Sequence, residues 1–430
     1  MKKHLFLLRV LSFFIFLNFP ITSFCYVENE ADYITISANS ADVSTAKDRR
    51  YLLYEVNFGE GFNLRRDVYM RVAQTVQALR QKGDNYVLVL PPWGNLYHWR
   101  DRATRVPWRE LFDLQSLNLF VPVIEFEEFL EENGNIIDHV VYLQHYAEGW
   151  NNGQWEEKFD VRKCINADNY YAKNGNIWKG FFYSYDIQAK NLTCLSIQGE
   201  ARTLANAVSL MFSDLRTVFI DRAETVLHNS FGNDVYWRIR RSMRYASHLL
   251  EYAEEYRQKY LDSNHDESWV DEYDQERTAV GGNYIAAHLR RQDFVRSHDK
   301  DVPSLEEAAI QLKKICDKLS IKKVFVATDA DENEIDQLSN LLSPHNIELF
   351  SFTSETPLSD GAVSIIDQII ASKARYFIGT HSSTFSYRIR EDREIMHFSL
   401  ESTFNDFCKY SKDIGNKDKC EQPAKWKIVY

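Results

Sequence analysis

Three short segments of this 430-residue chain combine residue types that could bind an anion or move a proton. In the first, Gly59–Asn63, the carboxylate Glu60 stands between two glycines, which permit a tight turn and the close approach of a ligand. We therefore consider Glu60 as a general base exposed in a cleft. The alternative is an acidic residue that only complements the dipole of a following helix, which would keep Glu60 ionised but weaken it as a base.

The second segment, His288–Asp293, follows an apolar run and contains two adjacent arginines, Arg290 and Arg291. The planar fork of arginine matches the oxygens of a diphosphate. The alternative is the exposed end of a strand, where an arginine pairs with Asp293. From these residues alone, both interpretations stay open.

The third segment, Gly379–Ser386, gathers hydroxyl side chains at the expected start of a helix. Hydroxyls and free backbone N–H groups in such a place form a phosphate cradle, although Thr384 or Ser382 could simply cap the helix. In the helix before this segment, Asp367 could hold a base or a ribose hydroxyl, or be an ordinary exposed carboxylate.

Other motifs give weaker indications. Asp329-Ala330-Asp331 fits the loose Asp-x-Asp pattern of metal-dependent sugar transferases, but three residues of an acidic loop match often by chance. No spacing of cysteine and histidine suggests zinc, and we predict no metal site. The sequence has no Gly-x-Gly-x-x-Gly fingerprint, Walker loop or Gly-x-Ser-x-Gly elbow, which weakens dehydrogenase, kinase and hydrolase interpretations.

The elements that must position these segments follow an α/β rhythm. Tyr51–Val56 is strand-like, an apolar stripe from Leu64 to Leu79 predicts a helix, and Tyr86–Leu90 is a second strand. The stripe consists of Leu64, Val68, Val72, Val76 and Leu79. Strand–helix–strand in this order implies a parallel sheet.

The same rhythm resumes after Asp262–Glu276, a polar and acidic stretch that predicts a linker or solvated loop. Beyond it we expect strands at Tyr284–Leu289, Val324–Ala327, Ile347–Phe352 and Tyr376–Ile378, and helices at Leu305–Leu319, Glu332–Leu342 and Val363–Lys373. In the first half, Thr203–Leu215 and Val235–Gln258 look helical, while Asp101–Asn176 has no clear repeat. We predict two α/β lobes, at residues 51–260 and 261–430, with a ligand in the crevice at the carboxyl ends of their strands.

The N-terminus predicts a secretory signal peptide over residues 1–25, followed by a flexible leader over residues 26–50. Lys2 and Lys3 precede an apolar run, strongest over Val10–Leu17, that is shorter than the ~20 residues of a membrane span. A signal anchor is the alternative. After cleavage we expect a soluble protein of a secretory lumen, without a membrane span.

A secretory lumen permits disulfides. We predict the pairs Cys164–Cys194 and Cys408–Cys420, with Cys25 lost with the signal and Cys316 left as a free core thiol, although spacing cannot prove connectivity. The sequon that begins at Asn191 predicts a glycan there, the alternative being an unused sequon.

The composition sets further bounds. The net charge is −11, and hydrophobic residues make up 44% and charged residues 26%, which is ordinary for a globular protein. An acidic balance argues against nucleic acid or an anionic membrane as partner. Aromatic residues reach 14%; the aromatic and basic segment Trp93–Trp108 could line a groove for a protein acceptor or supply core aromatics with solvated arginines.

With these segments assembled, the sequence resembles the protein O-fucosyltransferase 2 family, which modifies thrombospondin type 1 repeats. The resemblance is most specific in Glu60–Asp67 and covers almost the whole chain after the signal. It runs through Tyr51–Asp67, His288–Arg291, Asp301–Leu305, Val324–Ala330, Ile365–Gln368, Thr384–Ser386 and Cys420–Pro423.

The resemblance implies two facing Rossmann-like lobes of the GT-B type, with the active site in the cleft between them. It implies an inverting transfer of fucose from GDP-β-L-fucose to Ser or Thr hydroxyls of folded thrombospondin type 1 repeats in the endoplasmic reticulum lumen. Glu60 would take the proton of the acceptor hydroxyl, and Arg290 would neutralise charge on the leaving β-phosphate. The donor would be held by Gly59, Gly61, Phe62, Asn63, His288, Leu289, Asp367, Thr384 and Phe385.

The resemblance further implies that neither a metal nor a cofactor is required, since arginine and helix N-termini replace the cation. Two local departures are Phe58-Gly59, where prolines are expected, and His381 in the hydroxyl segment. Two competing interpretations are a fucosyltransferase that acts on glycans and a non-catalytic lumenal chaperone that grips the repeats.

Overall fold

The computed structural model describes residues 49–409 except 97–98, 102, 150–154, 181, 184, 230, 265, 271–275 and 299–301. The expected signal peptide, most of the expected leader and Cys420 lie outside the described residues. Within them, no helix is both long and apolar enough to cross a membrane.

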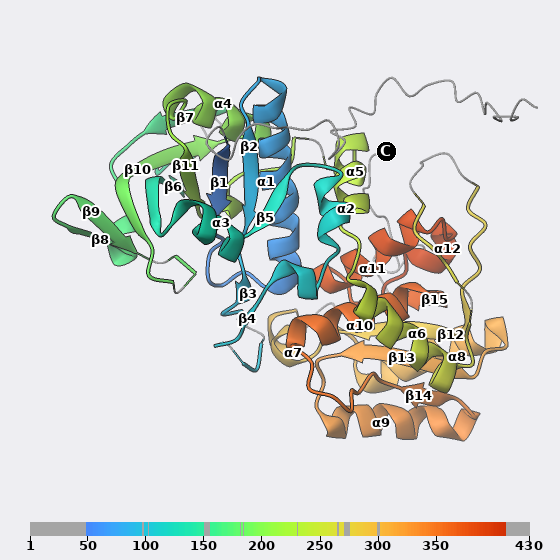
Figure 1. Cartoon of the computed structure of the whole chain (residues 1–430). Helices are drawn as coiled ribbons and strands as arrows, with labels where there is room; N and C mark the ends of the chain where they lie inside the picture. Colours follow the sequence, from blue (N-terminus) through green and yellow to red (C-terminus); the bar gives the residue numbers. More distant parts are fainter. Residues whose placement is uncertain are drawn as a thin grey trace, which may run out of the picture. The chain divides into compact units, whose positions relative to one another are not determined.

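A large, mostly parallel sheet organises the first half of the described chain (Figure 1). Its strands lie in the order β5 (Val123–Glu125), β2 (Tyr86–Leu90), β1 (Arg50–Tyr54), β11 (Thr217–Asp221), β6 (Ile136–Gln144), β10 (Gln188–Gln198), β9 (Ile177–Gly180) and β8 (Tyr171–Asn174). Neighbours from β5 to β10 pair parallel, whereas β9, β8 and β7 (Lys158–Val161) join antiparallel at the β10 end.

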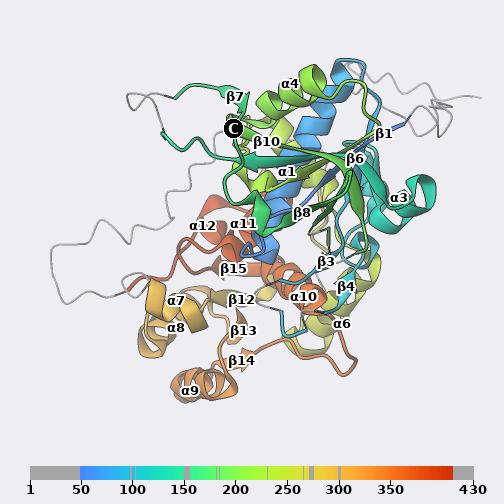
Figure 2. The ribbon, with the colours of Figure 1, turned by 90° about the vertical axis from the view of Figure 1, so that its left-hand side faces the viewer.

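Both faces of this sheet are buried, which explains the unbroken apolar runs of its central strands. In β1, Leu52 and Tyr54 join a cluster with α1 (Phe62–Gln81) and α4 (Ala201–Met211), whereas Tyr51 and Leu53 join a cluster on the opposite face. Figure 2 shows α1 and α4 together beside the sheet. The predicted stripe on α1 is buried from Val68 onward, but Leu64 in the first turn is exposed.

The second half is built on a smaller, fully parallel sheet. Its order is β14 (Glu348–Phe350), β13 (Lys323–Thr328), β12 (Gly282–Leu289) and β15 (Ala374–Ile378). One face packs on α8 (Leu305–Leu319) and α9 (Glu332–Leu342), and the other on α6 (Ser247–Leu261) and α10 (Asp360–Ser372) (Figure 1).

Shorter elements complete the described chain. They are the strands β3 (Trp93–Gly94) and β4 (Arg105–Val106), the helices α2 (Leu114–Asn118), α3 (Phe126–Asn133), α5 (Asp234–Ser242), α7 (Gln292–Ser297), α11 (Thr384–Ile395) and α12 (Leu400–Thr403), and the 3-10 turns η1 (Trp108–Glu110), η3 (Ala167–Asn169), η4 (Ala223–Thr225) and η5 (Ser343–His345).

Most predicted elements are present within a few residues, with one exception. The single helix expected over Val235–Gln258 is wrong, because the chain leaves α5 and forms an isolated bridge between Tyr245 and Phe112 before α6 begins. The long strands β6 and β10 were not anticipated; both pair with strands distant in the sequence, which no local pattern reveals.

The two halves share buried contacts. The apolar cluster that contains α1 continues into β12, α10 and α11 of the second half. Within it, Arg240 of α5 donates to Glu391 (2.7 Å) and to Asp392, both on α11, and all three side chains are buried. Buried charges are tolerated when they are paired in this way.

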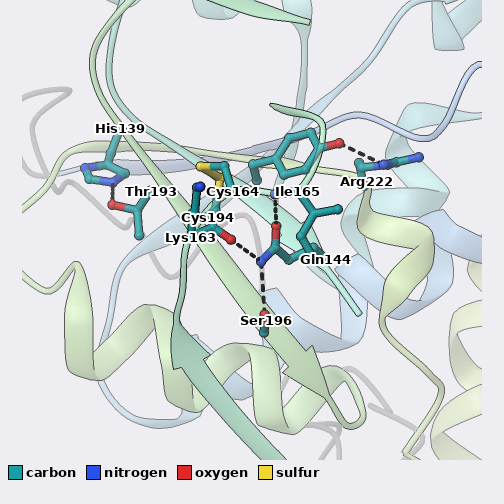
Figure 3. Close-up of a disulfide and its surroundings, with 10 residues drawn as sticks. His139, Gln144, Lys163, Cys164, Ile165, Thr193, Cys194, Ser196 and Arg222 are labelled. Atoms are coloured by element: carbon teal, nitrogen blue, oxygen red, sulfur yellow. Dashed lines mark hydrogen bonds between the residues drawn. A yellow bond between two sulfur atoms is a disulfide. The ribbon is translucent and has the colours of Figure 1, made fainter. Parts of the chain in front are cut away.

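Cys164 and Cys194 form a disulfide, the pair indicated by the sequence (Figure 3). Beside it, Gln144 of β6 donates to the Lys163 carbonyl (3.0 Å) and accepts from the Ile165 backbone (2.9 Å). These contacts fix the segment around Cys164 against β6 and β10.

The remaining predicted cysteine and glycan positions are as follows. Cys316 is a free, buried thiol, as expected. Cys408 is also disulfide-bonded, but its expected partner Cys420 lies outside the described residues. Asn191 is exposed on β10, and Thr193 of the same sequon is hydrogen-bonded to His139 (2.8 Å), also shown in Figure 3.

Candidate active site

The loop between β1 and α1 carries Glu60 and is fixed by hydrogen bonds at both ends. The Asn57 backbone donates to Glu224 (3.0 Å), and the Glu60 backbone donates to the Asn57 carbonyl (2.9 Å). Arg65 donates back to the Glu60 carbonyl (3.2 Å). Glu60 itself is half-buried, and a side chain added at the exposed Gly59 would meet open space. The loop is therefore ordered but leaves room on its outer side.

Three acidic residues lie near this loop: Glu55, which is buried, and Asp221 and Glu224, which are partly buried. Burial raises the pKa of Glu55 to about 7, although the Arg65 guanidinium lies 3.8 Å from its carboxylate. Burial likewise raises the pKa of Asp221 to about 6 and that of Glu224 above its ordinary value. Arg65 thus connects the Glu60 loop to Glu55, whose pKa is raised.

A small cavity opens beside the same loop. Its lining consists of Glu55, Val56, Phe58, Arg65, Pro92, Gly94, Asn95, Arg105 and Tyr183. Phe58, which stands where the resemblance leads us to expect proline, is 43% exposed here. The departure therefore places an accessible aromatic ring two residues from Glu60.

The start of α1 combines free backbone donors with a link to the second half. Its N-cap, Gly61, makes no side-chain capping bond, and the first turn contains no acidic residue. Exposed N–H groups at such a helix start attract anions. The Phe62 ring packs 4.9 Å from Trp93, so any contact of Phe62 with a donor would come from its backbone. Asn63 accepts from Gln368 of α10 (3.0 Å).

At the carboxyl end of β12, the two arginines differ. The buried Arg291 donates to Glu334 (2.6 Å) and to the Pro303 carbonyl (2.9 Å), which makes it structural. Arg290 donates to Asp329 and to Asp293 (2.6 Å), and its side chain is 15% exposed. Arg290 is therefore the better candidate for a diphosphate contact, and it has the Asp293 contact that the alternative interpretation expected.

The second and third predicted segments meet at this strand end. Thr380 donates to the His288 carbonyl (2.9 Å) and accepts from the Arg290 backbone (2.9 Å). The His288 ring is stacked on Phe385 at 4.4 Å, and its Nδ1 is hydrogen-bonded to Ser386 (2.8 Å). Burial, together with the positive charges of Arg290 and Arg390, lowers the pKa of His288 to about 3. His288 is thus a neutral ring that ties β12 to α11.

The start of α11 resembles that of α1. Thr384 is its first residue, and the N-cap Ser383 makes no side-chain capping bond. Neither Thr384 nor Ser382 is the capping residue, so the simple-cap alternative is not found. His381 of the same segment pairs with Asp406 (3.0 Å).

Asp367 of α10 has an unsatisfied atom. Its Oδ1 is buried and has no hydrogen-bond partner among the described residues. Burial raises the pKa of this carboxyl well above its ordinary value. A buried acceptor without a partner is costly unless another molecule supplies a donor. Its neighbour in the sequence, Gln368, contacts Asn63 at the start of α1.

Several other side chains are buried or locally bonded. The Leu289 side chain lies in the apolar cluster under α8, so any contact of Leu289 with a donor would come from its backbone. The side chains of Trp93, Trp99 and Trp108 are buried, which agrees with the core interpretation. Asp331 accepts from the Glu334 backbone (2.9 Å) as the N-cap of α9. In the described part of the chain, no group of three or more His, Cys, Asp or Glu side chains could hold a metal ion.

Four residues of this site were not expected from the sequence. Thr380 and Ser386 belong to the hydroxyl segment, but their partners across the sheet were not foreseen. Asp329 was set aside as a chance metal motif, whereas it contacts Arg290. Gln368 gave no signal beyond its place beside Asp367.

Comparison with known proteins places these residues in a family. Residues 51–396 match the family described as GDP-fucose protein O-fucosyltransferase. The chain is 47% identical to GDP-fucose protein O-fucosyltransferase 2 of Caenorhabditis elegans over 415 residues, covering 94% of this chain and 96% of the relative. It is 45% identical to the Homo sapiens protein of the same name, over 91% and 93% of the two chains. The Drosophila melanogaster protein of this name is 37% identical, over 88% and 82%.

Solved structures support the fold. The crystal structure of POFUT1 in complex with GDP-fucose superposes with a TM-score of 0.55 at 17% identity, covering 84% of this chain and 98% of that one. The complex of POFUT1 with GDP gives a TM-score of 0.53, over 81% and 95%. At this level of identity the likeness concerns the fold, which is the predicted GT-B arrangement of two α/β lobes.

Proposed function

Because this chain belongs to the GDP-fucose protein O-fucosyltransferase family, we propose that it transfers L-fucose from GDP-β-L-fucose to Ser or Thr hydroxyls of folded thrombospondin type 1 repeats, with inversion at the anomeric carbon. The observation that carries the proposal is the hydrogen-bonded junction of His288, Arg290 and Thr380. It joins the Arg290 backbone to the segment that leads into the uncapped start of α11, an arrangement suited to a diphosphate.

In the proposed reaction, Glu60 accepts the proton of the acceptor hydroxyl, and the oxygen of that hydroxyl attacks C1 of fucose. The bond between C1 and the β-phosphate oxygen breaks on the opposite face, and GDP leaves with the bonding electrons. Arg290 stabilises the charge that develops on this oxygen. The half-buried position of Glu60 and the ordered turn around it suit a base that must be held in one place.

The donor is proposed to span both lobes. Asp367 would accept a hydrogen bond from the base or the ribose, which would satisfy its buried Oδ1. The backbone at Gly59, Gly61, Phe62, Leu289 and Thr384, together with the side chains of Asn63, His288 and Phe385, would surround the rest. The acceptor side would lie on the lobe at residues 51–260 and the donor side on that at 261–430.

Three further properties are proposed from the resemblance. The acceptor would carry a Cys-x-x-Ser/Thr-Cys type segment, the enzyme would work in the endoplasmic reticulum lumen, and neither a metal nor a cofactor would be needed. Helix starts without side-chain caps at α1 and α11 offer N–H donors to phosphates, which supports the proposal that no metal is needed.

Transfer of labelled fucose from GDP-fucose to a folded repeat tests the proposal. Glu60→Ala should lower turnover by about 1,000-fold or more and leave GDP binding within about twofold, while Glu332→Ala on the exposed first turn of α9 should change neither. Transfer to a free glycan but not to the repeat would favour the glycan-directed alternative. Full function of Glu60→Ala in client secretion, without transfer, would favour a chaperone.

A further inference from the structure

Asp329 contacts the two arginines in different ways. One of its carboxylate oxygens accepts from the Arg290 guanidinium, and the other accepts from the Arg291 backbone (2.6 Å). The Asp329 side chain is 22% exposed and that of Arg290 15% exposed. The pair is thus largely withdrawn from solvent. Charge-assisted hydrogen bonds are strong when they are shielded from water.

The sheet explains why these residues meet. Leu289 of β12 lies opposite Thr328 of β13 in parallel register, so residues 290 and 329 leave the same edge side by side. Thr328 donates to the Leu289 carbonyl (2.6 Å), and Gln292 donates to the Asp329 carbonyl (2.7 Å). The Asp329 carboxylate is therefore fixed to the backbone of the strand end, whereas Asp293, which also accepts from Arg290, is 49% exposed on α7.

We infer that Asp329 is a positioning residue that holds the Arg290 guanidinium in the orientation needed at the donor diphosphate. The inference rests on the proposed function, in which Arg290 stabilises the leaving phosphate. The Asp329 charge should also repel the diphosphate before reaction, because both groups are anions that share one guanidinium. Asp329 should consequently raise turnover while lowering affinity for GDP.

The test is specific because turnover and affinity for GDP should change in opposite directions. Asp329→Asn keeps an acceptor for the Arg291 backbone but removes the charge. We expect GDP to bind about 3- to 10-fold more tightly by calorimetry and kcat to fall about 10- to 100-fold. Asp329→Glu keeps the charge but shifts it by one methylene, so kcat should fall while the Kd for GDP changes less than twofold.

Asp331→Asn is the matched control, two residues away. Because Asn caps a helix about as well as Asp, the melting temperature should change little, and kcat and the Kd for GDP should stay within about twofold. If Asp329→Asn weakens GDP binding and turnover together, in step with a lowered melting temperature, Asp329 is only structural and the inference is overturned. The inference is also overturned if kcat and the Kd for GDP of Asp329→Asn both stay within twofold of the wild type.

The double variant separates this inference from the proposed function. If Asp329 acts through Arg290, adding Asp329→Asn to Arg290→Ala should lower kcat no further. Loss of turnover in Arg290→Ala together with a normal Asp329→Asn would overturn the inference alone. Normal turnover in Arg290→Ala would overturn the proposed role of Arg290, and this inference with it.

Discussion

Gln368 of α10 donates a hydrogen bond of 3.0 Å to Asn63 at the start of α1, although 305 residues separate them in the chain. The same amide accepts from Arg66 (2.6 Å), and both Gln368 and Arg66 are fully buried. Gln368 follows directly on Asp367, the proposed donor contact. One short stretch of α10 thus joins the proposed nucleotide side to the loop that carries Glu60.

Replacing Gln368 by Leu should therefore affect both stability and donor binding. Asn63 and the buried Arg66 guanidinium would each lose a partner, which should cost about 2–4 kcal/mol in the free energy of unfolding. Without its anchor, Asn63 should bind the donor less well, and we expect GDP affinity to fall about 10-fold. Chemical denaturation and calorimetry measure the two effects.

Gln311→Leu is the control for this change. Gln311 on α8 is also buried and binds the backbone of Cys408 at both its amide atoms (2.8 Å each). Its loss should destabilise the protein comparably but leave GDP affinity unchanged. Equal GDP affinities in the wild type and Gln368→Leu would contradict the link through Asn63.

The buried carboxyl of Glu55 predicts a pH-dependent stability. Its pKa is about 7 in the folded protein and 4.5 ordinarily, so the folded state binds the extra proton between these values. Stability from this group is therefore present below pH 4.5 and is lost as the pH rises to about 7, by about 3 kcal/mol at most.

Glu55→Gln removes this titration. The stability of the variant relative to the wild type should increase between pH 4.5 and 7 and then stay constant, as measured by urea unfolding at several pH values. A difference between Glu55→Gln and the wild type that does not vary with pH would contradict the raised pKa of Glu55.

The buried ring of His288 predicts that stability depends on pH with the opposite sign. Its pKa is about 3 in the folded protein and 6.5 ordinarily, so between these values the unfolded chain binds more protons. Stability from the neutral ring is present above pH 6.5 and is lost on acidification towards pH 3, by about 1.4 kcal/mol per unit. His288→Gln should lose less stability than the wild type between pH 6 and 4. Equal losses in the two proteins would show that the ring becomes protonated in the folded state.

The Cys164–Cys194 disulfide should contribute to stability without affecting the donor site. It links residues 30 apart, and closing such a loop restricts the unfolded chain by about 3–4 kcal/mol. The double variant Cys164→Ala/Cys194→Ala should lose about this much stability in urea unfolding and keep its GDP affinity. Cys316→Ala, which removes a buried free thiol, should cost only about 1 kcal/mol. A large loss of GDP affinity in the double variant would mean that the disulfide supports the donor site.

Much of the architecture could be predicted because it depends on local periodicity. The helices α8 and α9 have the predicted bounds, since each has a clear apolar stripe and a polar N-cap residue, Ser304 or Asp331. The strands β1, β2 and β12 could be predicted because burial on both faces demands unbroken apolar runs. The break between α5 and α6 could not, because a distant partner, Phe112, causes it.

The sequence by itself determined which residue types stand at the ends of the strands: Glu60 between glycines, paired arginines after β12, and hydroxyls before α11. These follow from composition and spacing along the chain. Only the tertiary structure decided that the Arg291 guanidinium binds Glu334 and the Pro303 carbonyl, and that Asp329 accepts from the Arg290 guanidinium. The physical reason for the contact with Asp329 is that strand register brings residues 290 and 329 to the same sheet edge, although they are 39 positions apart and no local pattern relates them.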